Sequence, residues 1–248
     1  MSSSDRFMDN PFQESTMNTP NTTGNSFANI NEDLLAAHLQ ISTYDQFQLT
    51  DAVRPALDLK IKPTQGYRHD VYIDEETGSK VPVIMVAASK EILFPLFMDL
   101  VGRLGPMVDV VLETSHNANG GTHTDLYREH MDAPVLESTL WDFEDLLLND
   151  GCCGIAVLNP NTPQEVQFDE HKLLVIYGSP LEPFEFALEK RGVHYNPDMQ
   201  FITEAEHIHS SSEQHEQQFN SLRTELGLDG SQEMGREDLE NEDFDFQV

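Results

Sequence analysis

The chain is poor in positive charge, and this scarcity excludes several classes of partner. Its 248 residues include 14 Lys and Arg against 44 Asp and Glu, which gives a net charge of -30. Such an acidic chain is repelled by nucleic-acid backbones and by the anionic face of a membrane. The sequence therefore argues against direct nucleic-acid or membrane binding and favours a protein partner with a basic surface.

Cysteines and long apolar runs are also scarce. Cys152 and Cys153 are adjacent, so the chain has neither a spaced disulfide framework nor a Cys-x-x-Cys metal or redox pair. No run approaches the roughly 18 apolar residues that a membrane span needs, and the start MSSSDRFMDN lacks the pattern of a secretory signal. We therefore expect a cytoplasmic protein.

Local catalytic signatures are missing as well. The sequence contains no Gly-x-Gly-x-x-Gly, no phosphate-binding loop, no Gly-x-Ser-x-Gly elbow and no His-Glu-x-x-His. On these grounds the sequence leans against an enzyme.

Composition divides the chain into four parts. Residues 1–28 are rich in Ser, Thr, Asn and Pro and predict a disordered arm. Residues 29–65 predict short amphipathic helices and a linker, and residues 66–229 predict a single globular domain. Residues 230–248 predict a disordered acidic tail.

Capping patterns predict where several helices begin. Asn31 can cap a short helix, and Thr43 with Gln46 forms a second possible capping box. Ser89 precedes a helical apolar pattern that ends at Gly105, with Pro95 expected to kink that helix or delay its start.

Apolar patterns predict the strands. Residues 67–73 alternate and residues 81–88 are almost continuously apolar, which together indicate a hairpin. Residues 107–114 predict a second buried strand after the helix that follows Ser89, and hence a parallel strand-helix-strand crossover. Residues 115–131 predict a polar loop. With a second hairpin at residues 166–177, we expect an α/β fold, or an α+β fold, with helices packed on a mixed sheet.

One histidine pair is a candidate metal site. His207 and His209 are two residues apart in a predicted strand, so both imidazoles lie on one face, and Glu204 and Glu206 lie on the other. Exposed residues at a strand end would give the same pattern.

A second candidate site follows the predicted strand of residues 107–114. Glu113 and His116 lie where α/β folds commonly bind ligands, with His123 and His130 in the loop beyond. Glu113 could act there as a base or as a ligand to a divalent metal. A loop with unrelated histidines is the alternative.

The tail is a candidate for partner binding. Phe244 and Phe246 alternate with Asp243 and Asp245, and such termini can insert an aromatic ring while their charges steer toward a basic rim. A solubilising tail is the alternative.

Two functions therefore remain open. The first is a non-catalytic protein-interaction or regulatory module, and the second is a metal-assisted hydrolase or other small-molecule enzyme that uses the histidine and glutamate cluster. Mimicry of nucleic acid by ordered carboxylates is a third possibility.

Deleting residues 230–248 should leave the thermal stability of the protein nearly unchanged. The segment holds seven acidic residues and Arg236, a net charge of -6, with few apolar side chains that could pack on a core. Any binding of a basic partner should weaken in a salt-dependent way. Thermal unfolding of the full and truncated chains measures the first effect, and a fall of several degrees would show that the tail packs on the domain.

Overall fold

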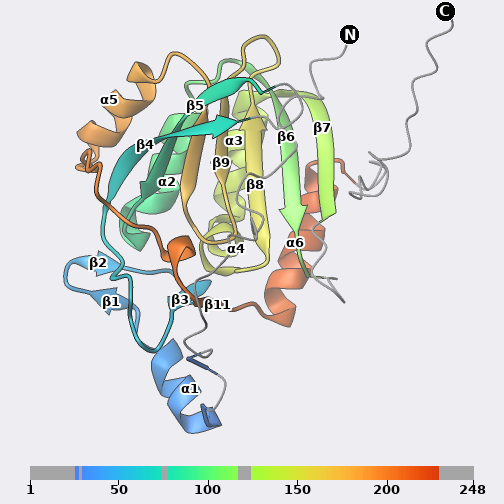
Figure 1. Cartoon of the computed structure of the whole chain (residues 1–248). Coiled ribbons are helices and arrows are strands. Elements are labelled where there is room, and N and C mark those ends of the chain that lie inside the picture. Colours follow the sequence, from blue (N-terminus) through green and yellow to red (C-terminus); the bar gives the residue numbers. More distant parts are fainter. Residues whose placement is uncertain (1–25, 28–29, 74–77, 117–123, 229–248) are drawn as a thin grey trace, which may run out of the picture.

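The computed structural model describes residues 26–27, 30–73, 78–116 and 124–228 (Figure 1). The tail candidates Phe244, Phe246, Asp243 and Asp245 lie outside these ranges, as does His123 of the predicted loop.

A seven-stranded sheet forms the centre of the molecule, and every neighbouring pair in it is antiparallel. The α/β fold class is confirmed, and the strand order, which the sequence left open, is β4-β5-β10-β9-β8-β6-β7. In this order the strands are β4 (Gly66–Ile73), β5 (Lys80–Ala87), β10 (Leu174–Tyr177), β9 (Glu165–Phe168), β8 (Cys153–Leu158), β6 (Met107–Thr114) and β7 (Thr124–Asp132).

Both predicted hairpins are present. The alternating strand β4 pairs with the apolar strand β5, and β9 pairs with β10. The predicted crossover is present as well, through α2 (Lys90–Val101). It joins β5 to β6, which run in the same direction but are separated by three strands. The sequence predicted a mixed sheet, whereas every pair of neighbouring strands in this sheet is antiparallel.

Helices cover one face of the sheet and enclose the main core. Figure 1 shows α2, α3 (Ala133–Asp142) and α4 (Glu144–Asn149) behind the strands. Phe94 and Phe97 of α2 are completely buried, and the Phe97 ring lies 5.2 Å from that of Phe168 on the sheet. The remaining helices are α5 (Glu182–Lys190) and α6 (Glu213–Glu225). None of the helices within the described ranges is long and apolar enough to cross a bilayer.

Helix α2 begins at Lys90, directly after Ser89, and continues through Pro95. Of the two outcomes expected at Pro95, a kink or a later start of the helix, the later start is therefore wrong. Asn31 caps α1 (Glu32–Leu39) as predicted, with its side chain accepting a hydrogen bond from the Leu34 N–H at 2.8 Å.

Two other predictions from local pattern are wrong. The capping box at Thr43 does not start a helix, because β1 (Thr43–Tyr44) and β2 (Phe47–Gln48) form a small hairpin instead. Asp45, with φ at 52°, makes its turn, a conformation that Asp tolerates better than most residues. The predicted loop of residues 115–131 contains most of β7, an edge strand with few inward apolar side chains such as Leu126 and Met131.

A second, smaller sheet lies at one end of the large one. It pairs β3 (Val53–Pro55) with β11 (His207–His209), at the lower end of the large sheet in Figure 1. The 3-10 helix Ile202–Glu204 precedes β11. Segments from both ends of the described chain thus meet at the edge of the sheet where the candidate site lies.

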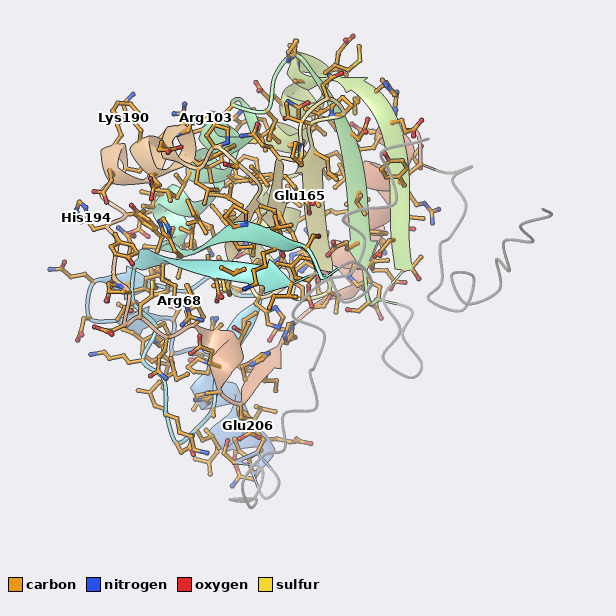
Figure 2. The ribbon with its side chains drawn as sticks, turned by 45° about the horizontal axis from the view of Figure 1, so that its top comes forward. Arg68, Arg103, Glu165, Lys190, His194 and Glu206 are labelled. Carbon is orange, nitrogen blue, oxygen red and sulfur yellow. The ribbon has the colours of Figure 1, made fainter. Side chains whose placement is uncertain are left out.

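The face of the large sheet opposite α2 contains buried polar groups. Glu165 and Gln167 of β9 are both about 5% exposed or less. Figure 2 labels Glu165 over the strands, whereas Arg103, Lys190 and Glu206 lie at the periphery. Among the described residues, Glu165 Oε2 has no hydrogen-bond partner, and burial raises the pKa of this carboxyl to about 8. Glu165 is therefore protonated in the folded protein at neutral pH.

Replacing Glu165 with Gln should stabilise the protein at pH 8 and change little at pH 4.5. In the unfolded chain the Glu165 carboxyl loses its proton above its ordinary pKa of 4.5, whereas in the folded chain it keeps the proton up to about pH 8. The free energy of unfolding of the wild type therefore falls between pH 4.5 and about 8. A difference of about 3.5 pKa units between the folded and unfolded states corresponds to a gain on the order of 4 kcal/mol in the free energy of unfolding at pH 8. Urea unfolding at both pH values measures it, with Glu129→Gln on the exposed side of β7 as the control. An equal effect at both pH values would contradict this account.

Candidate functional site

Polar side chains from four distant segments meet at the lower end of the large sheet. The register places Thr114, the last residue of β6, beside Cys153, the first residue of β8. The end of β9 lies on the other side of β8, where Phe168 faces Ile155. The turn that joins β9 to β10 and the small strand β11 complete this edge. Residues that are 36 or more positions apart in the sequence, such as His171 and His207, therefore become neighbours.

Three histidines form a compact group at this edge. One ring nitrogen from each of His171, His207 and His209 lies within 4.8 Å of those of the other two. Their ring centroids are 4.7 to 5.1 Å apart. All three residues are partly buried, which leaves the group accessible from solvent. We call these three side chains the imidazole triad.

The Nδ1 atom of each ring contacts an oxygen acceptor. His207 Nδ1 lies 2.9 Å from the Ala205 carbonyl, and His209 Nδ1 lies 2.7 Å from the Gly151 carbonyl. His171 Nδ1 lies 3.1 Å from Oδ2 of Asp169. A carbonyl oxygen can only accept, so the Nδ1 atoms of His207 and His209 carry the proton. In a neutral ring Nε2 then has the free lone pair, which is the arrangement found in metal-binding histidines.

Local structure explains why these rings converge. In β11 the pairing sets His207 opposite Pro55 and His209 opposite Val53, so both project to the same side of the strand. His171 lies in the β9–β10 turn, where Asp169 Oδ1 accepts the Leu173 N–H at 2.8 Å. Asp169 thus stabilises the turn with one carboxylate oxygen and orients His171 with the other.

The environment keeps two of the rings uncharged. Burial lowers the pKa of His207, and it lowers the pKa of His209 to about 4. Burial also disfavours the charged form of His171, but Asp169 and Glu170 outweigh it and raise the pKa of that ring. Neutral imidazole is the form that binds a metal ion.

A buried ammonium lies beneath the turn. Lys172 Nζ donates a hydrogen bond to the Cys153 carbonyl at 2.8 Å, and the residue is only 6% exposed. Burial lowers its pKa, whereas the carboxylates of Asp150, Asp169 and Glu170 favour its charge. Lys172 therefore partly compensates the negative charge at this edge.

A second group of potential ligands lies beside the triad. One ligand atom from each of His116, Asp150 and Cys152 lies within 4.8 Å of the others, and His116 Nε2 is 2.8 Å from Asp150 Oδ2. Burial disfavours the Asp150 carboxylate, but His116, Ser211 and Lys172 hold its pKa below the ordinary value. The two groups touch through Gly151, whose carbonyl contacts His209.

The structure separates the four metal-ligand candidates of the sequence. His207 and His209 lie together, whereas His116 belongs to the second group. Glu113 belongs to neither: its carboxyl accepts a hydrogen bond from Gln167 Nε2 at 3.1 Å, and burial with neighbouring carboxylates raises its pKa well above the ordinary value. His130 is on an exposed part of β7, 3.9 Å from Glu129.

Sequence reasoning missed His171. It lies in the five residues DEHKL between β9 and β10, and no spacing rule links it to residues 207 and 209. The acidic partners proposed for the other side of β11 are occupied elsewhere, since Glu204 pairs with Arg68 at 2.6 Å and Glu206 accepts the Ser26 N–H.

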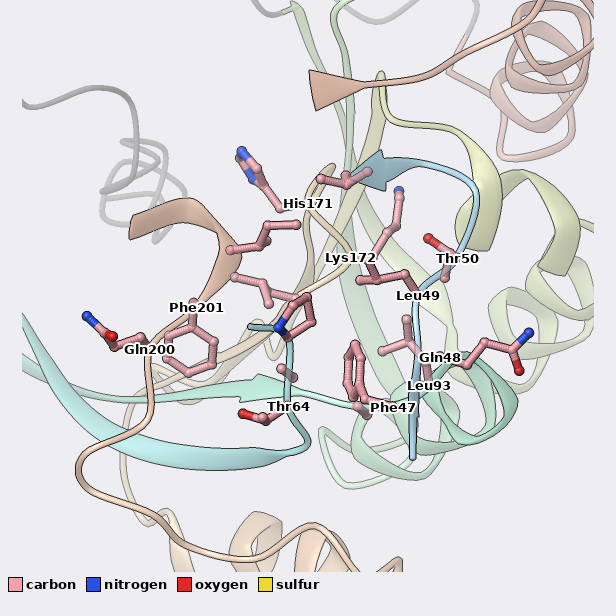
Figure 3. Close-up of a pocket in the computed structure, with 16 residues that line it drawn as sticks. Phe47, Gln48, Leu49, Thr50, Thr64, Leu93, His171, Lys172, Gln200 and Phe201 are labelled. Atoms are coloured by element: carbon pink, nitrogen blue, oxygen red, sulfur yellow. The ribbon is translucent and has the colours of Figure 1, made fainter. Parts of the chain in front are cut away.

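A small pocket lies next to the triad (Figure 3). Its volume is about 30 Å³, enough for one or two water molecules. Phe47, Leu93 and Phe201 make much of its lining apolar, and His171 lies at one end with its ring directed away from these side chains.

Comparison of the chain with protein-family models, with curated proteins and with solved structures finds no match.

Proposed function

We propose that this protein is a metal-dependent enzyme of the hydrolytic class, with His171, His207 and His209 as the ligands of one divalent transition-metal ion. The observation that carries the proposal is that the Nδ1 atom of every ring in the triad contacts an oxygen acceptor. Such contacts fix the ring orientation and leave the Nε2 lone pair available to a metal. Exposed histidines at a strand end would not require three such contacts.

The number of ligands supports catalysis over a purely structural role. Three protein ligands leave a fourth position for water or substrate, whereas structural zinc sites usually have four protein ligands. Imidazole nitrogen suits zinc, iron, nickel and copper. A bound water of lowered pKa would supply the nucleophile for hydrolysis.

The charge around the triad also favours a cation. Asp169 and Glu170 approach His171 at 3.1 and 3.9 Å, and the chain as a whole has a net charge of -30. A divalent ion would lower the negative charge at this edge. The three histidines are only partly buried, so a substrate can reach a metal held by them from solvent.

The variant His207→Ala/His209→Ala should bind about one zinc ion fewer per chain than the wild type. Chelator-treated protein is loaded with zinc, dialysed and assayed for metal by mass spectrometry. The matched control is His130→Ala/His194→Ala, which removes two imidazoles whose side chains are 60% and 72% exposed. His171→Gln tests the third ligand without altering β11.

Equal zinc content in all four proteins would contradict the proposal. Hydrolysis is tested separately with nitrophenyl esters of acetate and phosphate. We expect zinc-dependent turnover to fall at least about tenfold in the triad variants and to be unchanged in the control. Zinc bound by the triad without turnover of any ester would leave a binding site and remove the hydrolytic function.

We also propose that the protein binds a partner protein with a basic surface. The chain has 44 acidic residues and only 14 basic ones, which favours such a partner. Affinity purification from native cells at low and high salt tests it, because partners held by charge are lost at high salt.

A further inference from the structure

His116, Asp150 and Cys152 differ from the triad in chemistry and share no ligand with it. The group offers one nitrogen, one carboxylate oxygen and one sulfur within 4.8 Å. It lies where the end of β6 meets the start of β8, and Ser115 N donates to the Cys152 carbonyl at 3.0 Å there. Backbone pairing therefore fixes the two chain segments that carry these side chains.

The His116 ring is held in one orientation. Its Nδ1 lies 3.1 Å from Thr114 Oγ1, and its Nε2 lies 3.3 Å from Ser211 Oγ. The ring packs edge-on against Phe219 of α6 at 5.4 Å, and its side chain is 6% exposed. Nε2 is thus directed at the space shared with Asp150 and Ser211.

Asp150 supplies a buried carboxylate oxygen that faces His116 Nε2. Its side chain has no solvent exposure, and Oδ1 accepts the Cys152 N–H at 3.2 Å. Oδ2 lies 2.8 Å from His116 Nε2 without a hydrogen bond of standard geometry among the described residues, and the nearby His116 and Ser211 side chains favour its charged form. A buried charged oxygen in this state is costly unless a cation or a donor satisfies it.

The two cysteines have different environments. Cys153 is completely buried in the main core, and burial raises its pKa. Cys152 is only partly buried and has its sulfur beside His116 and Asp150. Adjacent residues of one strand end thus give a core cysteine and a potential ligand, and they provide a matched pair of variants.

We propose that His116, Asp150 and Cys152 form a second metal site, selective for a divalent ion of the zinc class. Nitrogen and thiolate ligands select zinc, cobalt or iron over magnesium and calcium, which prefer oxygen. The proposal does not depend on the imidazole triad being a metal site, because the two sets have no residue in common.

Cobalt(II) is the probe that separates the two sites, because a thiolate ligand gives a charge-transfer band in the near ultraviolet and imidazoles alone do not. Chelator-treated full-length protein is titrated with cobalt(II). The thiolate band should appear in the wild type, in Cys153→Ala and in His207→Ala/His209→Ala. Cys152→Ala should lose the band and one bound equivalent while it keeps the equivalent held by the triad.

A second measurement uses only proteins with an intact Cys152. Zinc should slow alkylation of Cys152 by iodoacetamide roughly tenfold or more, in the wild type and in His207→Ala/His209→Ala alike. Alkylation at the same rate with and without zinc would overturn the proposal, as would a thiolate band that persists in Cys152→Ala. If zinc protects Cys152 in the wild type but not in His207→Ala/His209→Ala, the proposal is also overturned, because zinc held by the imidazole triad would then be what shields the Cys152 thiol.

Discussion

The close approach of three backbone segments at Gly151 is the constraint on which this edge of the molecule depends. Gly151 N donates to the Ser210 carbonyl at 2.8 Å, and Ser210 N donates to the Ala52 carbonyl at 2.7 Å. A Cβ on Gly151 would lie 2.5 Å from the Ala52 oxygen, so no larger residue fits without a backbone shift. This contact fixes β11 against β3 and the start of β8, and so sets the position of both ligand groups.

Electrostatics at this edge follows from burial of several groups in a small volume. Burial and acidic neighbours raise the pKa of Glu113 well above its ordinary value, whereas His116 and Lys172 help to hold the pKa of Asp150 below its ordinary value. His207 and His209 are neutral because burial disfavours their charge. Lys172 alone does not balance Asp150, Asp169 and Glu170. The charged Asp150 carboxylate and the neutral rings of His207 and His209 suit this edge to bind cations.

Much of the fold could be predicted from local patterns. The alternation in β4 and the apolar run in β5 predicted their hairpin, and the capping residue Asn31 predicted α1. Local patterns failed where tertiary contacts decide the outcome. Residues 124–132 form a strand because they pair with β6, and their composition alone resembles a loop.

The candidate site was only partly predictable for the same reason. The period of two residues placed His207 and His209 on one face, and the structure agrees. His171 joins them through the strand order β10-β9-β8, which brings its turn beside β11 and which no local pattern encodes. Glu113 lies at the same end of β6 as His116, but strand alternation directs it to Gln167 instead.

Anomalous diffraction from crystals grown with zinc tests the central claim most directly. The account predicts an anomalous peak at the zinc edge about 2.0 to 2.1 Å from one ring nitrogen of each residue of the triad. Crystals that show His171, His207 and His209 in the same arrangement, with no anomalous peak between them at saturating zinc, would contradict it.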